Sequence, residues 1–173
     1  GAFMGRVGRY HIHATDTTAA FVGGLVRPIG TADANGVMTV TALCTTAAVV
    51  VGVIVSVEPV TRDSTLHRAA LTERYVYVAD DPATLFEVQD DGSSALTATV
   101  IGNVADLAST TSGSTITGRS IMELSTASVT ATGDGSEDVM ILGLVQRPSN
   151  AFGTNARYVV RLLNHFYAQD TGA

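Results

Sequence analysis

Two histidines separated by one residue, His11 and His13, are the first candidates for metal binding. Alternate side chains of an extended segment point to the same side, so the two imidazoles could share one metal ion. A third ligand would have to come from far along the chain, from His67, His165 or a carboxylate. Two histidines at this spacing are common by chance, and the alternative is a polar segment that packs on another surface. We therefore expect no metal ion and no other cofactor.

Two pairs of adjacent aspartates, Asp80-Asp81 and Asp90-Asp91, are candidates for calcium binding or for a glycosidase pair. Neither pair has the alternating oxygen ligands and terminal glutamate of a calcium loop. Aspartates that precede proline or glycine, as both pairs do, are typical of turns that their side chains cap. The chain also has no G-x-S-x-G elbow, phosphate-binding loop or H-E-x-x-H sequence. We therefore expect a protein that is not an enzyme.

The charge balance and the hydropathy pattern argue against two classes of partner. Sixteen acidic residues outnumber ten basic ones, all of them arginine, so the formal net charge is −6. This balance argues against general nucleic-acid binding, which depends on neutralising phosphates. The longest apolar run, residues 47–57, is shorter than the roughly 20 residues of a membrane-spanning helix. The single cysteine, Cys44, excludes an intrachain disulfide framework and is expected to be a small buried residue.

The spacing of apolar residues predicts an all-β fold, a small β-barrel or sandwich. Asn35-Gly36, between two apolar segments, is the strongest short signal for a hairpin. Residues 74–79 alternate tyrosine and valine, as expected for a strand with two different faces. Val49–Val57 is continuously apolar and predicts a central strand buried on both faces. Further strands are predicted over residues 25–29, 37–44, 84–89, 115–124, 139–145 and 157–166, and a short helix or ordered loop over residues 96–108.

The first twenty residues are predicted to form an extended N-terminal arm, ahead of one β-barrel or sandwich domain over residues 21–173. They have no helical periodicity and combine small residues with aromatic and basic ones. An extended segment can add to a neighbour's sheet edge through backbone hydrogen bonds, and arginines can clamp carboxylates with two hydrogen bonds. The alternative is a disordered tail. The predicted contacts with a capsid or neighbouring protein are Phe3, Arg6, Arg9 and Tyr10.

The segment RYVYVADDPATLFEVQ, residues 74–89, resembles a segment of the head-decoration (capsid cement) proteins of tailed bacteriophages. Further matching blocks are IGNVADL at residues 101–107, TGRSIMEL at 117–124 and LGLVQRPSNAFGTN at 142–155. With the closing strand, the resemblance covers residues 74–166, a little over half of the chain. Residues 24–57 resemble the small barrel of such proteins. No catalytic residue belongs to these blocks.

The resemblance implies a structural virion protein on the exterior of an icosahedral phage capsid, with the major capsid protein as its partner. Such proteins commonly form trimers where capsid subunits meet, and they stabilise the mature shell. Two further observations favour a homotrimer. Only 15% of the residues are charged, which suits a surface covered by neighbours, although it also fits an ordinary surface of low charge. A small barrel is not expected to cover Val49–Val57 together with Tyr158, Val160, Leu162 and Phe166.

Two other functions remain as alternatives. A carbohydrate- or receptor-binding β-module, such as a head fibre or adhesin domain, would need an exposed aromatic platform with acidic partners. Tyr75, Tyr77 and Asp80 could supply one, although the chain has no tryptophan. A hydrolase would depend on His11, His13 and the paired aspartates alone, and it is the weakest hypothesis.

Overall fold

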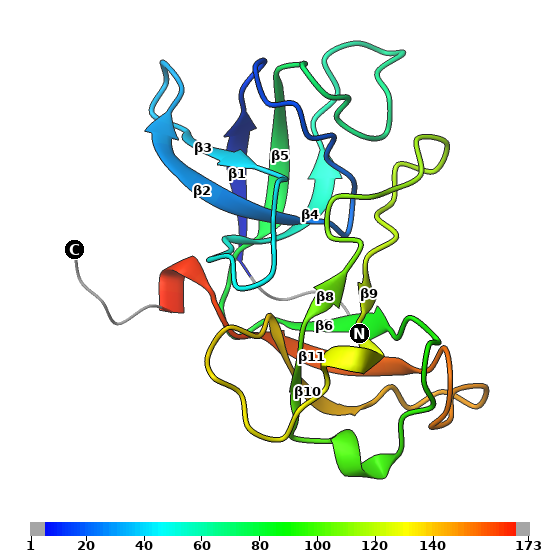
Figure 1. Cartoon of the computed structure of the whole chain (residues 1–173). Coiled ribbons are helices and arrows are strands. Elements are labelled where there is room, and N and C mark those ends of the chain that lie inside the picture. Colours follow the sequence, from blue (N-terminus) through cyan, green and yellow to red (C-terminus); the bar gives the residue numbers. More distant parts are fainter. Residues whose placement is uncertain (1–5, 169–173) are drawn as a thin grey trace.

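The computed structural model describes residues 6–168, whose strands form two lobes (Figure 1). The upper lobe is a closed five-stranded barrel, and the lower lobe contains a four-stranded sheet and a two-stranded sheet. The predicted all-β class is confirmed, because 39% of the residues are in strands and no described helix reaches seven residues. The helical segments are three single 3₁₀ turns: η1 (Ala98–Val100), η2 (Thr126–Ser128) and η3 (Phe166–Ala168).

The barrel strands lie in the order β1-β3-β2-β4-β5, and β5 pairs with β1 to close the barrel. All of these pairs are antiparallel except β1 with β3. The predicted hairpin joins β2 to β3, and Gly36 in its turn has φ +80°, a value that residues with a Cβ rarely adopt. The strands are β1 (Val7–Ile12), β2 (Leu25–Ala32), β3 (Met38–Thr41), β4 (Gly52–Val57) and β5 (Arg74–Ala79).

Residues 7–12, expected as part of an extended arm, are a strand of the barrel instead. β1 pairs with β5 over its whole length, from Val7 opposite Ala79 to Ile12 opposite Arg74. Its inward-facing side chains belong to the barrel core, which explains why a segment without helical periodicity is nonetheless ordered. The expected division at residue 20 therefore does not separate two parts of the structure.

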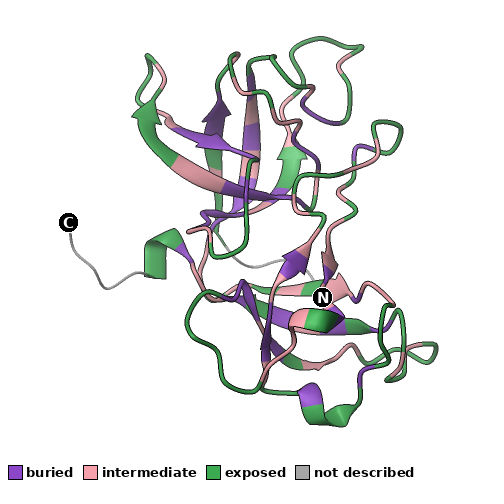
Figure 2. Cartoon of the chain, viewed as in Figure 1, coloured by how far each residue is buried: buried purple, intermediate pink, exposed green. Residues whose placement is uncertain are grey.

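The barrel wall has two apolar faces at its lower end, and this positions the second lobe. Inside the barrel, Val26, Val76 and Val78 form part of a fully buried core. On the outside, Leu25 and Val53 pack with the apolar residues of the lower lobe. Figure 2 shows buried residues along the barrel strands and along the middle of the lower sheet. One continuous apolar cluster therefore joins the two lobes.

The apolar segment Val49–Val57 differs from its prediction. The strand begins only at Gly52, where the backbone approaches β5 so closely that a Cβ would collide with the carbonyl oxygen of Ala79. Val55 is 41% exposed, so burial on both faces is wrong for this part of the strand. The reason is that the lower lobe covers only the lower end of the barrel wall, where Val53 lies.

The lower lobe is built around β10 and β11, which pair antiparallel with a bulge between Ile141 and Gly143. The four-stranded sheet has the order β6-β11-β10-β7. Of the strand predicted over residues 115–124, only the last two residues are in a strand, and the segment begins with a turn in which Ile116 is 88% exposed. The strands are β6 (Leu85–Gln89), β7 (Val104–Ala105), β8 (Leu107–Ala108), β9 (Glu123–Leu124), β10 (Val139–Leu144) and β11 (Arg157–Leu162).

The apolar side chains that were expected to drive trimer formation are mostly covered by the chain itself. Tyr158, Val160 and Leu162 are buried in the apolar cluster that joins the two lobes. Phe166 lies beyond the strand and is partly exposed. This argument for a trimer is therefore wrong. Cys44 is buried in the same apolar cluster, as predicted, and burial raises the pKa of its thiol to about 12. Within residues 6–168, no helix has the length and hydropathy needed to cross a membrane.

Candidate functional site

A cluster of polar side chains, some buried and some exposed, lies where the two ends of the described chain meet at the base of the barrel. We call Arg6, Tyr10, Asp80, His165 and Tyr167 the terminal cluster. The Tyr10 hydroxyl donates a hydrogen bond to Asp80 Oδ2 at 2.5 Å, and it lies 2.8 Å from the Tyr167 hydroxyl. Because Tyr10 has one hydroxyl proton and gives it to the carboxylate, Tyr167 is the donor to Tyr10. The cluster thus joins β1, the end of β5 and η3.

Charge and burial determine the protonation of the terminal cluster. Asp80 is 1% exposed, and its Oδ1 lies 3.3 Å from Arg6 Nε. The Arg6 guanidinium carbon lies 5.1 Å from the centre of the Tyr167 ring, a cation–π distance. Burial, helped by the hydrogen bonds to Asp80 and Tyr167, raises the pKa of Tyr10 far above its usual value. Tyr10 therefore remains a hydrogen-bond donor at physiological pH.

Three of the four residues predicted to contact a capsid or neighbour lie in the described part of the chain. Tyr10 is only 3% exposed, so its side chain offers almost no surface to a partner in this structure. Arg6 keeps most of its side chain exposed, although it pairs with Asp80. Arg9 already holds a carboxylate of its own chain. The fourth predicted residue, Phe3, lies outside the described residues.

Arg9 is the centre of a second polar group, on the outer face of the barrel. Its Nε and Nη2 each donate a 2.8 Å hydrogen bond to Glu58, the two-bond geometry that was expected with a neighbour. The guanidinium carbon also lies 3.6 Å from the centre of the Tyr75 ring. The Tyr75 hydroxyl donates to Asp33 at 2.5 Å, and this bond and the Val37 N–H lower the pKa of Asp33 to about 2. The polar side chains of this outer face are therefore bonded to one another.

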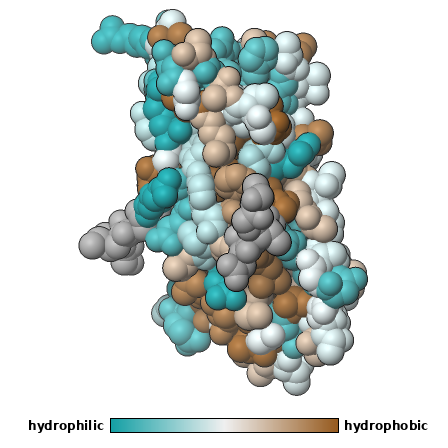
Figure 3. Space-filling view, turned by 90° about the vertical axis from the view of Figure 1, so that its left-hand side faces the viewer, coloured by the Kyte–Doolittle hydropathy of each residue, from teal (hydrophilic) through white to brown (hydrophobic). Residues whose placement is uncertain are grey.

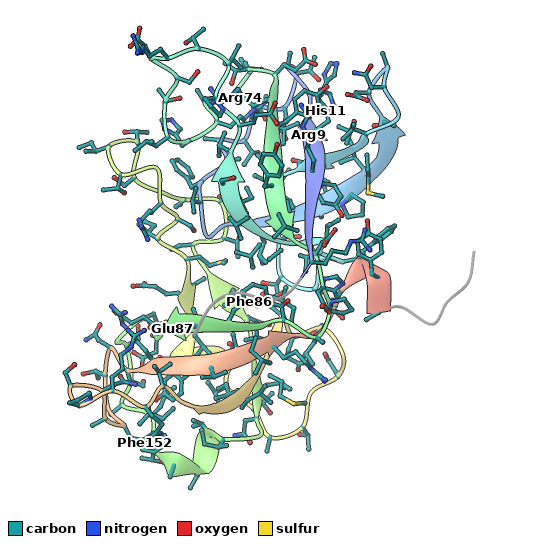
Figure 4. The ribbon with its side chains drawn as sticks, turned by 180° about the vertical axis from the view of Figure 1, so that it is seen from behind. Arg9, His11, Arg74, Phe86, Glu87 and Phe152 are labelled. Atoms are coloured by element: carbon teal, nitrogen blue, oxygen red, sulfur yellow. The ribbon has the colours of Figure 1, made fainter. Side chains whose placement is uncertain are left out.

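The histidines do not assemble a metal site. His11 and Arg9 lie on the same face of β1, where the labelled view places them together (Figure 4). The two His11 ring nitrogens lie 3.0 Å from Thr39 Oγ1 and 3.0 Å from Glu73 Oε1. The His13 ring is 5.9 Å from the His11 ring, edge to face. Between residues 6 and 168, no three histidine, cysteine or carboxylate side chains are grouped as metal ligands.

Each aspartate pair contains a carboxylate that caps a turn, as predicted, although Asp80 bonds Tyr10 instead. Asp81 accepts a hydrogen bond from the Ala83 N–H at 2.8 Å. Asp90 is fully buried and accepts backbone N–H groups from Gly92, Asn155 and Ala156. These bonds tie the turn after β6 to the segment before β11.

Arg68 is a buried cation that the sequence did not indicate. It is fully buried, and its guanidinium donates to the main-chain oxygens of His13, Asp16, Thr18 and Thr72. Burial lowers its pKa from the usual value, although arginine remains charged. This side chain therefore orders the loop after β1. No local pattern marks Arg68 for this role, because its partners are backbone groups of a distant loop.

Exposed aliphatic side chains gather on two loops at the side of the barrel. We call Val60, Leu66 and Ile116 the loop patch; they are 72%, 65% and 88% exposed. The loops touch, because a Cβ at Gly118 would collide with the Leu66 side chain, and they form neighbouring projections in Figure 1. Large apolar side chains exposed together are typical of contact surfaces. Sequence patterns missed this group, because loop proximity is not readable from local spacing.

The side of the molecule that lies on the left in Figure 1 has a different character. In Figure 3, hydrophobic residues are more frequent on the lower lobe and at its junction with the barrel, whereas hydrophilic residues are more frequent around the barrel.

No protein-family model, curated protein or solved structure was found to match the chain.

Proposed function

We propose that the chain is a structural virion protein that binds the outer surface of an icosahedral phage capsid and stabilises the mature shell. The observation that carries the proposal is the place in the fold of the segment that resembles decoration proteins. Residues 74–89 form β5, the link that contains Asp80, and β6, so they join the barrel to the lower sheet. The aspartates of this segment are engaged in packing and turn capping. The segment that resembles decoration proteins therefore connects the two lobes, and this supports a structural role for the chain.

The proposed mechanism is thermodynamic linkage. A protein that binds only the mature lattice stabilises that lattice by mass action. Each occupied site contributes about 2.7 kcal/mol when the free protein is at 100 times its dissociation constant. A shell has many identical sites, so small contributions add up over the particle.

We infer that surface loops, rather than an N-terminal arm, make the main contact with the capsid. Two observations support this choice. Tyr10 and Arg9 are hydrogen-bonded to carboxylates of their own chain, whereas the loop patch is exposed and apolar. Burial of aliphatic side chains such as these contributes roughly 1.5–3 kcal/mol each. The homotrimer stays a proposal that depends on the resemblance to decoration proteins.

The test is co-sedimentation of the purified chain with empty capsid shells of the phage that encodes it. Mature, expanded shells that lack the protein should bind it in saturable amounts, and unexpanded shells should bind little. Bound protein should also raise the temperature at which the mature shells disrupt. Absence of binding to mature shells contradicts the proposal.

Carbohydrate binding has less support. The three residues considered for an aromatic platform do not form one, because Asp80 is buried and Arg9 covers a face of the Tyr75 ring. A glycan array probed with the same preparation distinguishes the two functions. Selective glycan binding, together with no capsid binding, would favour the adhesin.

A further inference from the structure

The C-terminal turn, residues 163–168, is attached to the barrel by a small number of contacts. The Val50 N–H donates to the Asn164 carbonyl oxygen at 2.8 Å, and the Phe166 N–H donates to the Val50 carbonyl oxygen at 2.7 Å. The Tyr167 hydroxyl reaches Tyr10 in the terminal cluster. Two further bonds attach the start of the turn to the lower lobe: the Leu163 N–H donates to the Asp138 carbonyl oxygen at 2.9 Å, and Asn164 Nδ2 donates to the Glu137 carbonyl oxygen at 3.2 Å. Among residues 6–168, the part beyond Asn164 is hydrogen-bonded to the rest of the chain only at Val50 and Tyr10, so a change at one side chain there can alter its equilibrium between bound and released states.

His165 lies in the middle of this turn, and its ring is buried. The residue is 2% exposed, and its Nδ1 accepts a hydrogen bond from the Tyr167 N–H at 3.2 Å. A neutral imidazole has one acceptor nitrogen and one N–H, so the ring proton is on Nε2. Nε2 is buried and has no hydrogen-bond partner among residues 6–168. The bound turn therefore requires the neutral ring in one tautomer.

We propose that protonation of His165 in mildly acidic solution releases the C-terminal turn from the barrel. A protonated imidazole has an N–H on both nitrogens and accepts no hydrogen bond. Nδ1 would then direct an N–H toward the N–H of Tyr167, which replaces an attractive contact by a repulsive one. The same event would place a positive charge in a site that is closed to water.

The charged and titratable groups around His165 act in opposite directions. Asp80 and Asp81, from the link between β5 and β6, favour the protonated ring, but burial opposes it more strongly and lowers the pKa of His165 below its usual value. Arg6 pairs with Asp80 and reduces its attraction for a second cation. The hydroxyls of Tyr10 and Tyr167 are hydrogen-bonded to each other. The neutral ring is thus the form that the folded turn stabilises.

The sign of the pH effect follows from this lowered pKa. Above the pKa of an unperturbed histidine, about 6.5, the ring is neutral in the bound and released turn alike. Below that pH, the released turn binds a proton more readily than the bound turn. The ratio of bound to released turn then falls by up to tenfold per pH unit, until the pKa of the bound state is reached.

Release of the turn would uncover apolar surface on the barrel. Val50 is buried under the turn, and Phe166 lines a hollow together with Pro28 and Met38. Exposed apolar surface of this kind promotes association with other apolar surfaces. Protonation at one histidine would therefore change the contact properties of the base of the barrel.

Native-state amide hydrogen exchange tests the proposal directly. The protection factor of the Phe166 amide, measured from pH 7.5 to pH 5.0, should fall by up to tenfold per pH unit below about pH 6.5. The amide of Val76 in the barrel core should keep its protection, which separates release of the turn from global unfolding. In His165→Gln the side chain cannot titrate, so Phe166 protection should no longer depend on pH. His13→Gln, at an exposed histidine, is the matched control and should behave as the wild type.

Two results would overturn the proposal. One is constant protection of Phe166 across this pH range in the wild type, and the other is an unchanged pH dependence in His165→Gln. If His165→Gln does not fold, the wild type still decides the question through an NMR titration of the His165 ring. A ring pKa at or above 6.5, or no accompanying shift of the Tyr167 ring signals, rejects the mechanism.

Discussion

A buried hydroxyl contributes to stability only when it has a partner, and two buried tyrosines of this chain differ in that respect. Tyr10 donates to a buried carboxylate, whereas the hydroxyl of buried Tyr158 has no hydrogen-bond partner among the described residues. Both rings belong to apolar cores. Comparing substitutions at these two tyrosines therefore measures what the hydrogen bond in the terminal cluster contributes to the free energy of unfolding.

We expect Tyr10→Phe to lower the free energy of unfolding by about 1–3 kcal/mol, because it removes a donor from the buried carboxylate of Asp80. Tyr158→Phe should be neutral or slightly stabilising, since it removes a hydroxyl that has no partner. Urea denaturation of both variants measures the difference. Equal effects of the two substitutions would mean that the hydrogen bond to Asp80 contributes nothing.

Asp33 should show a pH effect of the same sign as that of His165, but at a lower pH, because the pKa of both groups is lowered in the folded state. Its folded pKa of about 2 lies below the usual value of 3.8, so its contribution to stability is complete above pH 4 and is lost as the pH falls toward 2. Tyr75→Phe removes the largest cause and should move the pKa of Asp33 toward 3.8. An NMR titration of the Asp33 carboxyl carbon checks this, with Tyr77→Phe as a control that leaves the Asp33 pKa unchanged.

At the scale of elements, sequence patterns identified strands where one face of the strand is apolar. Tyrosine and valine alternate in β5, and the valines are buried. The alternation therefore predicted both the strand and its division into two different faces. β1 was not predicted as a strand because glycine, arginine and histidine interrupt its apolar residues, and pairing with the distant β5 and β3 makes it a strand. The terminal cluster was equally hidden, because its members come together only when the barrel closes.

Deletion of residues 1–12 should therefore destroy the barrel rather than remove a tail. Without β1, the edges of β3 and β5 lose their partner, and unpaired edges favour aggregation. We expect this variant to be insoluble or to lack a cooperative thermal transition in circular dichroism. Deletion of residues 1–5 retains every described strand and is the control. A shortened chain without residues 1–12 that melted like the full chain would contradict the assigned role of β1.

The loop patch gives a second prediction at this scale. Leu66→Ser and Ile116→Ser together should reduce co-sedimentation with mature shells at least tenfold, because both side chains would be buried in the contact. Their exposure means that the melting temperature should hardly change, as for most surface substitutions. Leu142→Ser, on the lower sheet, is the matched control. Full binding by the double variant would place the capsid contact elsewhere.

At the scale of the whole molecule, the shared apolar cluster determines how the lobes respond to stress. Leu25, Val50 and Val53 of the barrel segment pack in one cluster with Val139 and Val160 of the lower lobe. Exposing this interface without unfolding both lobes would leave a large apolar area in water. The lobes are therefore expected to behave as one cooperative unit.

We expect a single unfolding transition. With fluorotyrosine incorporated, the ¹⁹F signals of Tyr75 in the barrel and Tyr158 in the lower sheet should disappear at the same urea concentration. A chain in which one signal persists while the other is lost would have lobes that unfold separately. Val53→Ala, which weakens the shared cluster, should shift both midpoints together.

The pairing of β1 with β5 and of β6 with β11 also bears on how the chain is made. Each pair joins segments that are far apart in sequence, so long loops must close before either lobe is complete. Such topologies fold slowly compared with helical bundles of similar size. During synthesis, β6 has no partner until β11 has left the ribosome, and its free edge is exposed to neighbouring nascent chains. Co-expressed chaperones and a low growth temperature should therefore raise the yield of folded protein, even if the folded protein itself is stable.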